Sequence, residues 1–174
     1  MRILGIDPGL GRCGFGLIET TTRTGAKALD FGVVTTTVDA SLPSRLKELY
    51  DSLSEVFEQT KPELVAVEKL FFAKNITTGI AVAEARGVVL LVAEQKGVKV
   101  FEYTPNKIKK SLTGYGAATK TQMQEMVRVH LGLEKKPKPD DAADALAAAI
   151  TCAFLYRTSA EEKYKFSNSR KKYD

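Results

Sequence analysis

Short apolar runs and amphipathic stretches alternate along the chain, and together they predict a definite order of strands and helices. The predicted elements are strands at 2–7, 15–21 and 26–38, a helix at 44–59, a strand at 64–67, a helix ending at 95, a strand at 98–103, and helices at 104–112, 119–131 and from 139 onward. Apolar residues at helical spacing mark the helices, and short apolar runs rich in strand-forming residues mark the strands. This order is typical of an α/β fold that opens with three consecutive antiparallel strands.

The first and fourth predicted strands each end on a carboxylate. The apolar run 3–6 leads into Asp7, and the run 64–67 leads into Glu68. In open α/β sheets, sites form at the carboxyl ends of parallel strands. Two buried strands that both end in acids therefore indicate a site more strongly than either strand alone. The Gly-rich segment 9–14 favours a tight hairpin beside the first of these acids.

The last predicted helix begins with an acidic pair on a face that continues as apolar. Asp141 and Asp144 are three residues apart, so their Cβ atoms lie about 5–6 Å apart on one side of a helix. Further along, that side carries Ala145, Ala148, Cys152 and Leu155. Asp140 is interpreted as the N-cap, a role that cannot explain Asp144 one turn further in. Buried aspartates are rare unless they are paired or bind a metal. The small alanines would let a neighbouring backbone come close.

Four acids are thus candidates for one site: Asp7, Glu68, Asp141 and Asp144. If the fold brings them together, unit charges about 5 Å apart repel by roughly 3 kcal/mol per pair at an effective dielectric constant near 20. Divalent cations would relieve this repulsion, and ligation by carboxylates alone favours Mg²⁺ or Mn²⁺ over Zn²⁺. Two such ions about 4 Å apart stabilise the attacking and leaving oxygens in phosphodiester cleavage.

Composition excludes several other classes of protein. A chain of 174 residues, 44% hydrophobic and 27% charged, fits one globular domain with a full core. No apolar run is long enough to span a membrane, and the N-terminus shows no secretory signal. Cys13 and Cys152 form no motif and are expected to be core thiols, which favours a cytoplasmic location. With His130 as the single histidine, the chain has no His-rich metal site.

Positive charge is concentrated in the C-terminal half, on both sides of the acidic pair, and the net charge is +5. The basic residues between 105 and 139 are Lys107, Lys109, Lys110, Lys120, Arg128, Lys135, Lys136 and Lys138. Thr119 and Gln122 form a capping box that places Lys120 in the first turn of a helix, where the helix dipole disfavours a cation. A phosphate would offset that penalty, although a solvated lysine is an alternative. Basic surroundings of an acidic centre indicate a polyanionic substrate held over a cation site.

Two aromatic residues, Phe71 and Phe72, follow the fourth strand, together with Lys74. Aromatic rings beside a lysine in a loop can stack on nucleobases, whereas core packing is the alternative for each ring. We interpret one ring as exposed and the other as core.

Several ordered motifs resemble the RuvC family of Holliday-junction resolvases, within the retroviral integrase and ribonuclease H superfamily. They are Gly5-Ile6-Asp7-Pro8-Gly9, Glu68-x-x-Phe71-x-Ala73-Lys74-Asn75, Ala85-Arg86-Gly87 and Asp141-Ala142-Ala143-Asp144-Ala145-Leu146-Ala147. The resemblance extends to about Tyr156. It implies a ribonuclease H-like fold whose five-stranded mixed sheet has strands 1–3 antiparallel and strands 4 and 5 parallel to strand 1. The expected division is therefore a nuclease domain at 1–156 and a basic, disordered tail at 157–174.

The resemblance also implies a function and the residues that perform it. The expected protein is a homodimeric endonuclease that nicks two opposed strands of a four-way DNA junction in recombination and repair, leaving 5′-phosphate and 3′-hydroxyl ends. Asp7, Glu68, Asp141 and Asp144 would bind two Mg²⁺ ions, for which Mn²⁺ could substitute. By position, Phe71 matches an aromatic that engages bases, and Lys109 and Lys120 match basic residues near the scissile phosphate; Lys74 joins this nucleic-acid-binding set. A branch-migration complex is an implied partner.

Three alternatives remain open from the sequence. A nuclease acting on ribosomal RNA precursors could share the fold and the acids. A phosphotransferase of the actin and sugar-kinase type also begins with a strand, an Asp and a Gly-rich hairpin, but it needs a second domain for which 174 residues are too few. A non-catalytic junction-binding protein would explain the basic residues, but it leaves four acids without a purpose.

Overall fold

The computed structural model describes the backbone of residues 1–21, 25–69 and 76–170, with side chains described except at 76–78 and 157–170. Within these residues, five strands form one sheet: β1 (Arg2–Asp7), β2 (Arg12–Thr20), β3 (Ala26–Thr35), β4 (Leu64–Glu68) and β5 (Lys99–Tyr103). Their order across the sheet is β3-β2-β1-β4-β5. β1, β2 and β3 pair antiparallel, whereas β4 runs parallel to β1 and β5 parallel to β4. The predicted mixed sheet is therefore confirmed.

The helices of the described residues connect and cover the strands: α1 (Leu42–Thr60), α2 (Ile76–Gln95), α3 (Pro105–Thr113), α4 (Lys120–Leu131) and α5 (Asp140–Arg170). Local chemistry sets several of their ends. Thr104 accepts a hydrogen bond from the Lys107 backbone at the start of α3. The predicted capping box of Thr119 and Gln122 opens α4, and Gly132 ends it in the left-handed conformation that glycine tolerates.

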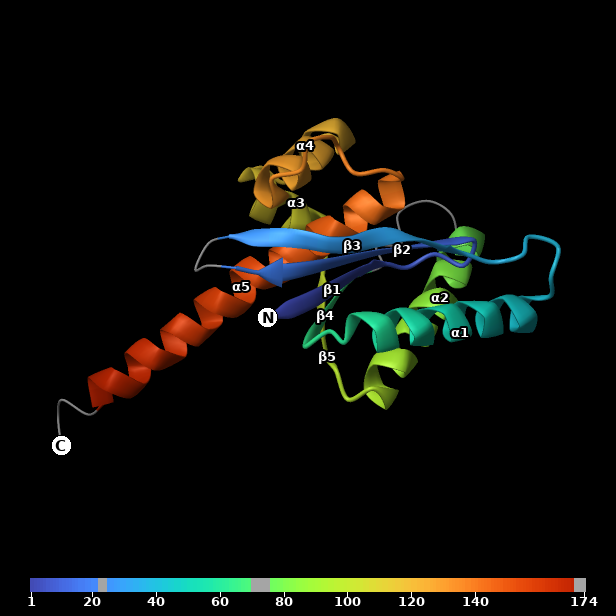
Figure 1. Ribbon diagram of the computed structural model, residues 1–174, viewed down its shortest axis with the longest axis horizontal. Helices are drawn as coiled ribbons and strands as arrows, with labels where there is room; N and C mark the ends of the chain where they lie inside the picture. Colours follow the sequence, from blue (N-terminus) through green and yellow to red (C-terminus); the bar gives the residue numbers. More distant parts are fainter. Residues whose placement is uncertain (22–24, 70–75, 171–174) are drawn as a thin grey trace.

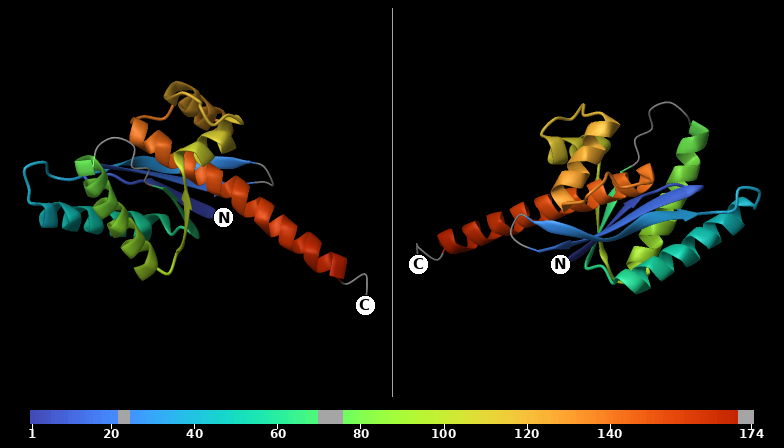
Figure 2. Two further views of the ribbon diagram at one scale, coloured as in Figure 1. Left: turned by 180° about the vertical axis from the view of Figure 1, so that it is seen from behind. Right: turned by 45° about the horizontal axis from the view of Figure 1, so that its top comes forward.

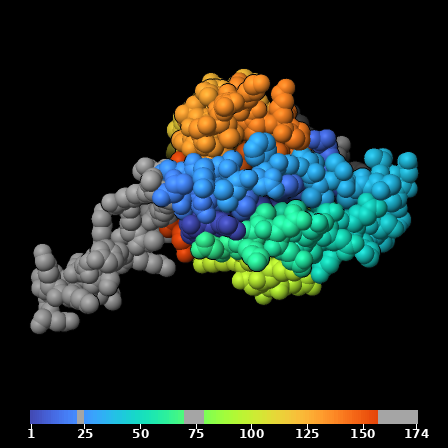
Figure 3. Space-filling view, in the orientation of Figure 1, coloured from blue at the N-terminus to red at the C-terminus, as the bar shows by residue number. Residues whose placement is uncertain are grey.

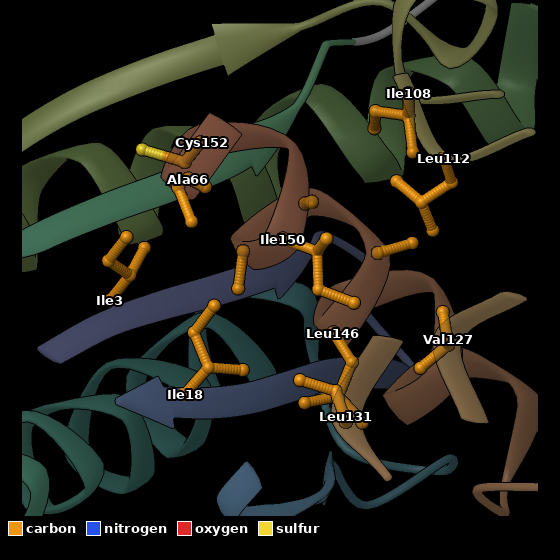
Figure 4. Close-up of a cluster of buried hydrophobic side chains, with 14 of the residues drawn as sticks. Ile3, Ile18, Ala66, Ile108, Leu112, Val127, Leu131, Leu146, Ile150 and Cys152 are labelled. Carbon is orange, nitrogen blue, oxygen red and sulfur yellow. The ribbon is translucent and has the colours of Figure 1, made fainter. Parts of the chain in front are cut away.

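The sheet separates two groups of helices. α1 and α2 cover one face, and α3, α4 and α5 lie on the other (Figures 1 and 2). In the space-filling view, α4 stands above the β2–β3 surface while α1 lies below it (Figure 3). Strand side chains alternate between the two cores: Ile3 packs on the α5 side and Leu4 on the α1 side. The α5-side core is drawn in Figure 4, where Leu146 and Ile150 of α5 lie in one cluster with Ile18 of β2.

α5 lies directly on the backbone of the sheet. A methyl group added at Gly5 would collide with the carbonyl oxygen of Ala145, and one added at Gly16 would come 2.7 Å from Cγ of Leu146. The two strand glycines and the small residues Ala145 and Ala149 thus let the helix backbone touch the sheet between the larger side chains of the core. The expectation that the alanines allow a close backbone approach is confirmed.

The end of α5 differs from the expected tail. The helix continues past Tyr156 to Arg170, where the sequence predicted no regular structure. Ala160, Glu161, Glu162 and Lys163 are good helix formers, and neither Pro nor Gly interrupts the segment. A functional division between 1–156 and 157–174 stays a prediction. In the part of the chain that the structure describes, no helix is both long and apolar enough to cross a membrane.

Candidate active site

The alternation of side chains along β1 and β4 aims both strand-end acids at α5. Ile3 lies in the α5-side core, so Asp7, four residues further along β1, has the same facing. Ala66 lies in that core too, which gives Glu68 the same facing on β4. Because β1 and β4 are parallel neighbours, the two acids lie side by side at the edge formed by the carboxyl ends of these strands.

The first turns of α5 bring the other two acids to this edge. Asp141 lies in the first turn. Its backbone carbonyl is so close to Gly14 of β2 that a methyl group added there would collide with it. Gly14 in turn pairs with Asp7 across the β1–β2 ladder. Asp144 follows on the same side of the helix, three residues on. The four predicted acids thus come from β1, β4 and α5 to one end of the sheet.

A cleft of about 280 Å³ opens beside these acids. Its described lining consists of Glu68, Pro105, Ile108, Lys109, Lys120, Met123, Asp144 and Ala147. An adjoining hollow shares Glu68, Pro105 and Asp144 with this cleft and adds Asp7, Pro8, Lys69 and Val82. Three of the four acids therefore line a continuous concave surface, together with Lys69, Lys109 and Lys120.

Asp7 is the most perturbed acid of the site. Burial, reinforced by the charges of Glu68, Asp144 and Asp141, raises its pKa from 3.8 to about 8, and Lys120 only partly offsets this. Both causes disfavour the ionised carboxylate, since a buried charge loses hydration and neighbouring anions repel it. A shift of this size in a cleft makes Asp7 a candidate functional residue.

Glu68 and Asp144 are perturbed in the same direction. Burial first, and then the charge of Asp144, raise the pKa of Glu68 to about 7, while Lys109 and Lys120 act against the rise. Burial also raises the pKa of Asp144, although Lys120 opposes it. The acids are therefore electrostatically coupled and form a single cluster of negative charge.

Lys120 bridges the acids on α5. Its ammonium nitrogen lies 3.2 Å from Oδ2 of Asp140 and 3.5 Å from Oδ2 of Asp144. These anions raise the pKa of Lys120, although its partial burial acts in the opposite direction. The carboxylates thus offset the cost of a cation in the first turn of α4, where the sequence had indicated a phosphate. Lys109, on α3, faces Glu68 across the cleft.

Asp140 does not have the predicted capping role. The carbonyl oxygen of Pro139 accepts the first bonds of α5, from the backbone nitrogens of Ala142 and Ala143, so Asp140 is already inside the helix. Its side chain instead accepts a hydrogen bond from Gln124 of α4, at 2.7 Å, and pairs with Lys120. Interpretation of Asp140 as the N-cap was wrong because the preceding proline supplies the start of the helix.

Arg12 is a site residue that the sequence reasoning missed. Its Nε and Nη2 atoms lie 2.9 and 2.8 Å from Oδ2 of Asp141. Arg12 opens β2 two residues before Gly14, so strand periodicity gives it the facing of that glycine, toward α5. The sequence could predict which side of the strand Arg12 occupies, but not that the start of α5 lies on that side.

The donor chemistry of the cluster fits hard divalent cations, since all four acids are oxygen donors and a cation would relieve their repulsion. Within the residues whose side chains are described, however, no group of three or more His, Cys, Asp or Glu is already arranged to hold a metal ion. Arg12 and Lys120 hold the carboxylates of Asp141 and Asp144 instead. Rotations of these side chains would be needed to share an ion among the acids.

Phe71, Phe72 and Lys74, predicted beside the site, lie outside the described residues. In the sequence they fall between the end of β4 at Glu68 and the start of α2 at Ile76. Their contribution to nucleic-acid binding stays a prediction.

The strand order, the parallel acid-bearing strands and the acid-bearing helix laid across them define a ribonuclease H-like protein. A family model described as crossover junction endodeoxyribonuclease RuvC matches residues 3–152. The chain belongs to the RuvC family of crossover junction endodeoxyribonucleases, as the motif resemblance implied.

Individual relatives agree over nearly their whole length. The chain is 48% identical to crossover junction endodeoxyribonuclease RuvC of Thermomicrobium roseum, an alignment covering 92% of this chain and 97% of the relative. It is 50% identical to the same-named protein of Heliobacterium modesticaldum, with 88% and 94% covered. The structure of Thermus thermophilus RuvC in complex with Holliday junction substrate matches with a TM-score of 0.87 at 37% identity, over 91% of this chain and 96% of that one.

Proposed function

We propose that this protein is a metal-dependent endonuclease that resolves four-way DNA junctions by paired nicks on opposed strands, leaving 5′-phosphate and 3′-hydroxyl ends. The observation that carries the proposal is the convergence of Asp7, Glu68, Asp141 and Asp144 at one end of the sheet. The relatives' names and the Thermus thermophilus complex support the choice of substrate.

The four acids are the proposed metal ligands, and Mg²⁺, in two sites and replaceable by Mn²⁺, is the proposed cofactor. Bound ions would supply the positive charge that stabilises the attacking and leaving oxygens of the phosphodiester. The perturbed pKa values of Asp7 and Glu68 support this assignment, because a divalent cation favours their ionised forms.

Lys109 and Lys120 are proposed to hold the phosphate over the acids. Both line the cleft, from α3 and α4 respectively, opposite Glu68 and Asp144. Their charges would attract the DNA backbone, and Lys120 would exchange a carboxylate partner for a phosphate oxygen when DNA enters. Phe71 and Lys74 are proposed to contact the junction from the neighbouring segment.

Incubation with a synthetic four-way junction and Mg²⁺ tests the proposal. We expect paired nicks at symmetric positions in opposed strands, products that DNA ligase can reseal, and no cutting in excess chelator. A duplex of the same sequence and a structured RNA are the comparison substrates. Junction binding without strand breakage, or a preference for the RNA, would refute the assignment.

A second copy of this chain is the proposed partner for one face of α2. Ala85, Val89 and Val92 are buried on its inner side. On the outer side, Ile80 and Leu91 are 53% and 51% exposed, and a methyl group added at Gly87 between them meets no neighbour. An apolar helix stripe with a small central residue permits close packing of two helices. A symmetric dimer would supply two sites for paired cuts.

Replacing Leu91 with Arg is expected to separate the two subunits. An unpaired charge buried in an apolar interface would weaken the dimer by about 100-fold or more, since each 1.4 kcal/mol is about tenfold in affinity. Light scattering coupled to gel filtration measures the molar mass, and the junction assay should show single uncoordinated nicks. Val38→Arg is the matched control, because Val38 is 78% exposed in the segment between β3 and α1. A Leu91→Arg protein that stays dimeric would contradict the α2 interface.

One further partner and the cellular location are also proposals. A branch-migration complex is proposed from family resemblance alone. A cytoplasmic location is proposed because Cys13 and Cys152 are both unpaired and buried, as expected in a reducing compartment.

A further inference from the structure

Arg12 makes a close contact with the acidic cluster that the proposed function leaves unused. Both of its bonds, from Nε at 2.9 Å and from Nη2 at 2.8 Å, end on Oδ2 of Asp141. The pair joins the start of β2 to the first turn of α5, 129 positions apart in the chain. The Arg12 side chain is 53% exposed and that of Asp141 is 30% exposed, so solvent ions can reach both.

The backbone holds this pair in place. Next to it, the carbonyl of Asp141 lies against Gly14, two residues after Arg12 on the same strand, and no side chain separates strand from helix there. Arg12 therefore approaches Asp141 from a rigid strand rather than from a loop. Its planar guanidinium can direct two N–H groups at one carboxylate, as it does toward Asp141.

The charged neighbourhood gives the pair an electrostatic consequence. The charge of Asp141 acts on Asp7 and on Asp144, and Lys120 pairs with Asp144 on α5. Each of the two cations therefore neutralises one acid of the α5 pair. A divalent cation that uses Asp141 as a ligand must share it with Arg12 or displace Arg12 from it.

We propose that Arg12 is a positioning residue that competes with the divalent cation for Asp141, stabilising the cluster when no cation is bound and weakening cation affinity. This inference rests on the proposed function of the four acids. It predicts opposite effects of removing Arg12 on two measurable quantities: metal affinity rises, while stability in chelator falls. If the salt bridge were purely structural, its removal would lower stability without raising the affinity for the metal.

Isothermal titration of the full chain with Mn²⁺, in the absence of DNA, is the experiment. For Arg12→Gln we expect an affinity for Mn²⁺ increased on the order of 10-fold, or about 1.4 kcal/mol, because the guanidinium that lies 2.8 Å from Oδ2 of Asp141 no longer competes with the ion for that carboxylate. Thermal unfolding in EDTA should occur at a lower temperature than for the wild type. Arg12→Lys keeps the charge and should restore most of the wild-type affinity.

Two controls separate this effect from a general change of charge. Lys27→Gln removes a cation of matched exposure, 55%, whose partner is Glu19 elsewhere on the sheet, and should leave Mn²⁺ affinity unchanged. In an Asp141→Asn background, Arg12→Gln should have no further effect on affinity, since Arg12 is proposed to act through Asp141.

The possible results separate a failure of this inference from a failure of the proposed function on which it rests. If the wild type binds Mn²⁺ and cuts junctions but Arg12→Gln binds the metal equally or more weakly, the competition is refuted and the proposed function stands. If the wild type binds no Mn²⁺ at saturable stoichiometry, the metal site and the role of Arg12 both fall.

Discussion

Replacement of Asp7 by Asn is expected to lower the rate of junction cutting by at least about 1,000-fold while junction binding persists. Asp7 is central to the cluster, because the charges of Glu68, Asp141 and Asp144 all act on it. An amide of the same shape cannot supply the negative charge that binds a cation, and a thousandfold loss corresponds to about 4 kcal/mol of transition-state stabilisation. Removing a negative charge should not weaken the attraction of a polyanion.

Single-turnover cleavage and a gel-shift assay in Ca²⁺ measure the two quantities separately. Asp30→Asn is the matched control: it makes the same chemical change at an exposed position of β3 and should cut at the wild-type rate. If Asp7→Asn cuts within tenfold of wild type, Asp7 is not a ligand of a catalytic metal, and the proposed site has to be abandoned.

Asp7→Asn is also expected to raise the free energy of unfolding at pH 8 when a chelator removes divalent cations. Asp7 has a pKa near 8 in the folded chain, against 3.8 as the ordinary value. Between these values the unfolded chain has released the proton while the folded chain retains it. Asp7 therefore makes its full contribution to the free energy of unfolding below about pH 3.8, and that contribution is lost as the pH rises to about 8. Asparagine does not ionise and escapes this loss.

We expect a gain for Asp7→Asn of roughly 2–4 kcal/mol in the free energy of unfolding at pH 8, shrinking toward zero near pH 4. Urea unfolding in EDTA from pH 4 to 8.5 measures it. Added Mg²⁺ should reverse the order of stability, because only the wild type gains free energy by binding the ion. Parallel pH profiles for wild type and variant would show that Asp7 does not carry the raised pKa.

Much of the site could be predicted because its residues obey local periodicities. Asp7 and Glu68 each end a buried run, and a period of two places both on the side of the sheet that α5 covers. Asp141 and Asp144 are one helical turn apart, which fixes their common side. The capping box likewise fixed the position of Lys120 at the start of α4. These are all relations between residues close in the sequence.

What could not be predicted depends on contacts between distant segments. Arg12 became a site residue only when β2 was placed against the start of α5, and Asp140 acquired its partners from α4 rather than from its own helix. The continuation of α5 to Arg170 was missed because a polar composition was read as disorder, although the segment contains no residue that stops a helix.

The glycine contacts beneath α5 also determine where the chain tolerates insertions and deletions. Since α5 lies on the bare backbone at Gly5 and Gly16, it cannot slide along the strands without steric collision. One residue added between Asp144 and Ala145 would turn the acid pair by about 100° relative to the anchored part of the helix. Residues added between α4 and α5, ahead of Asp140, would leave that geometry intact. Active variants should therefore tolerate insertions and deletions in the connection between α4 and α5, but not within the part of α5 that lies on the sheet.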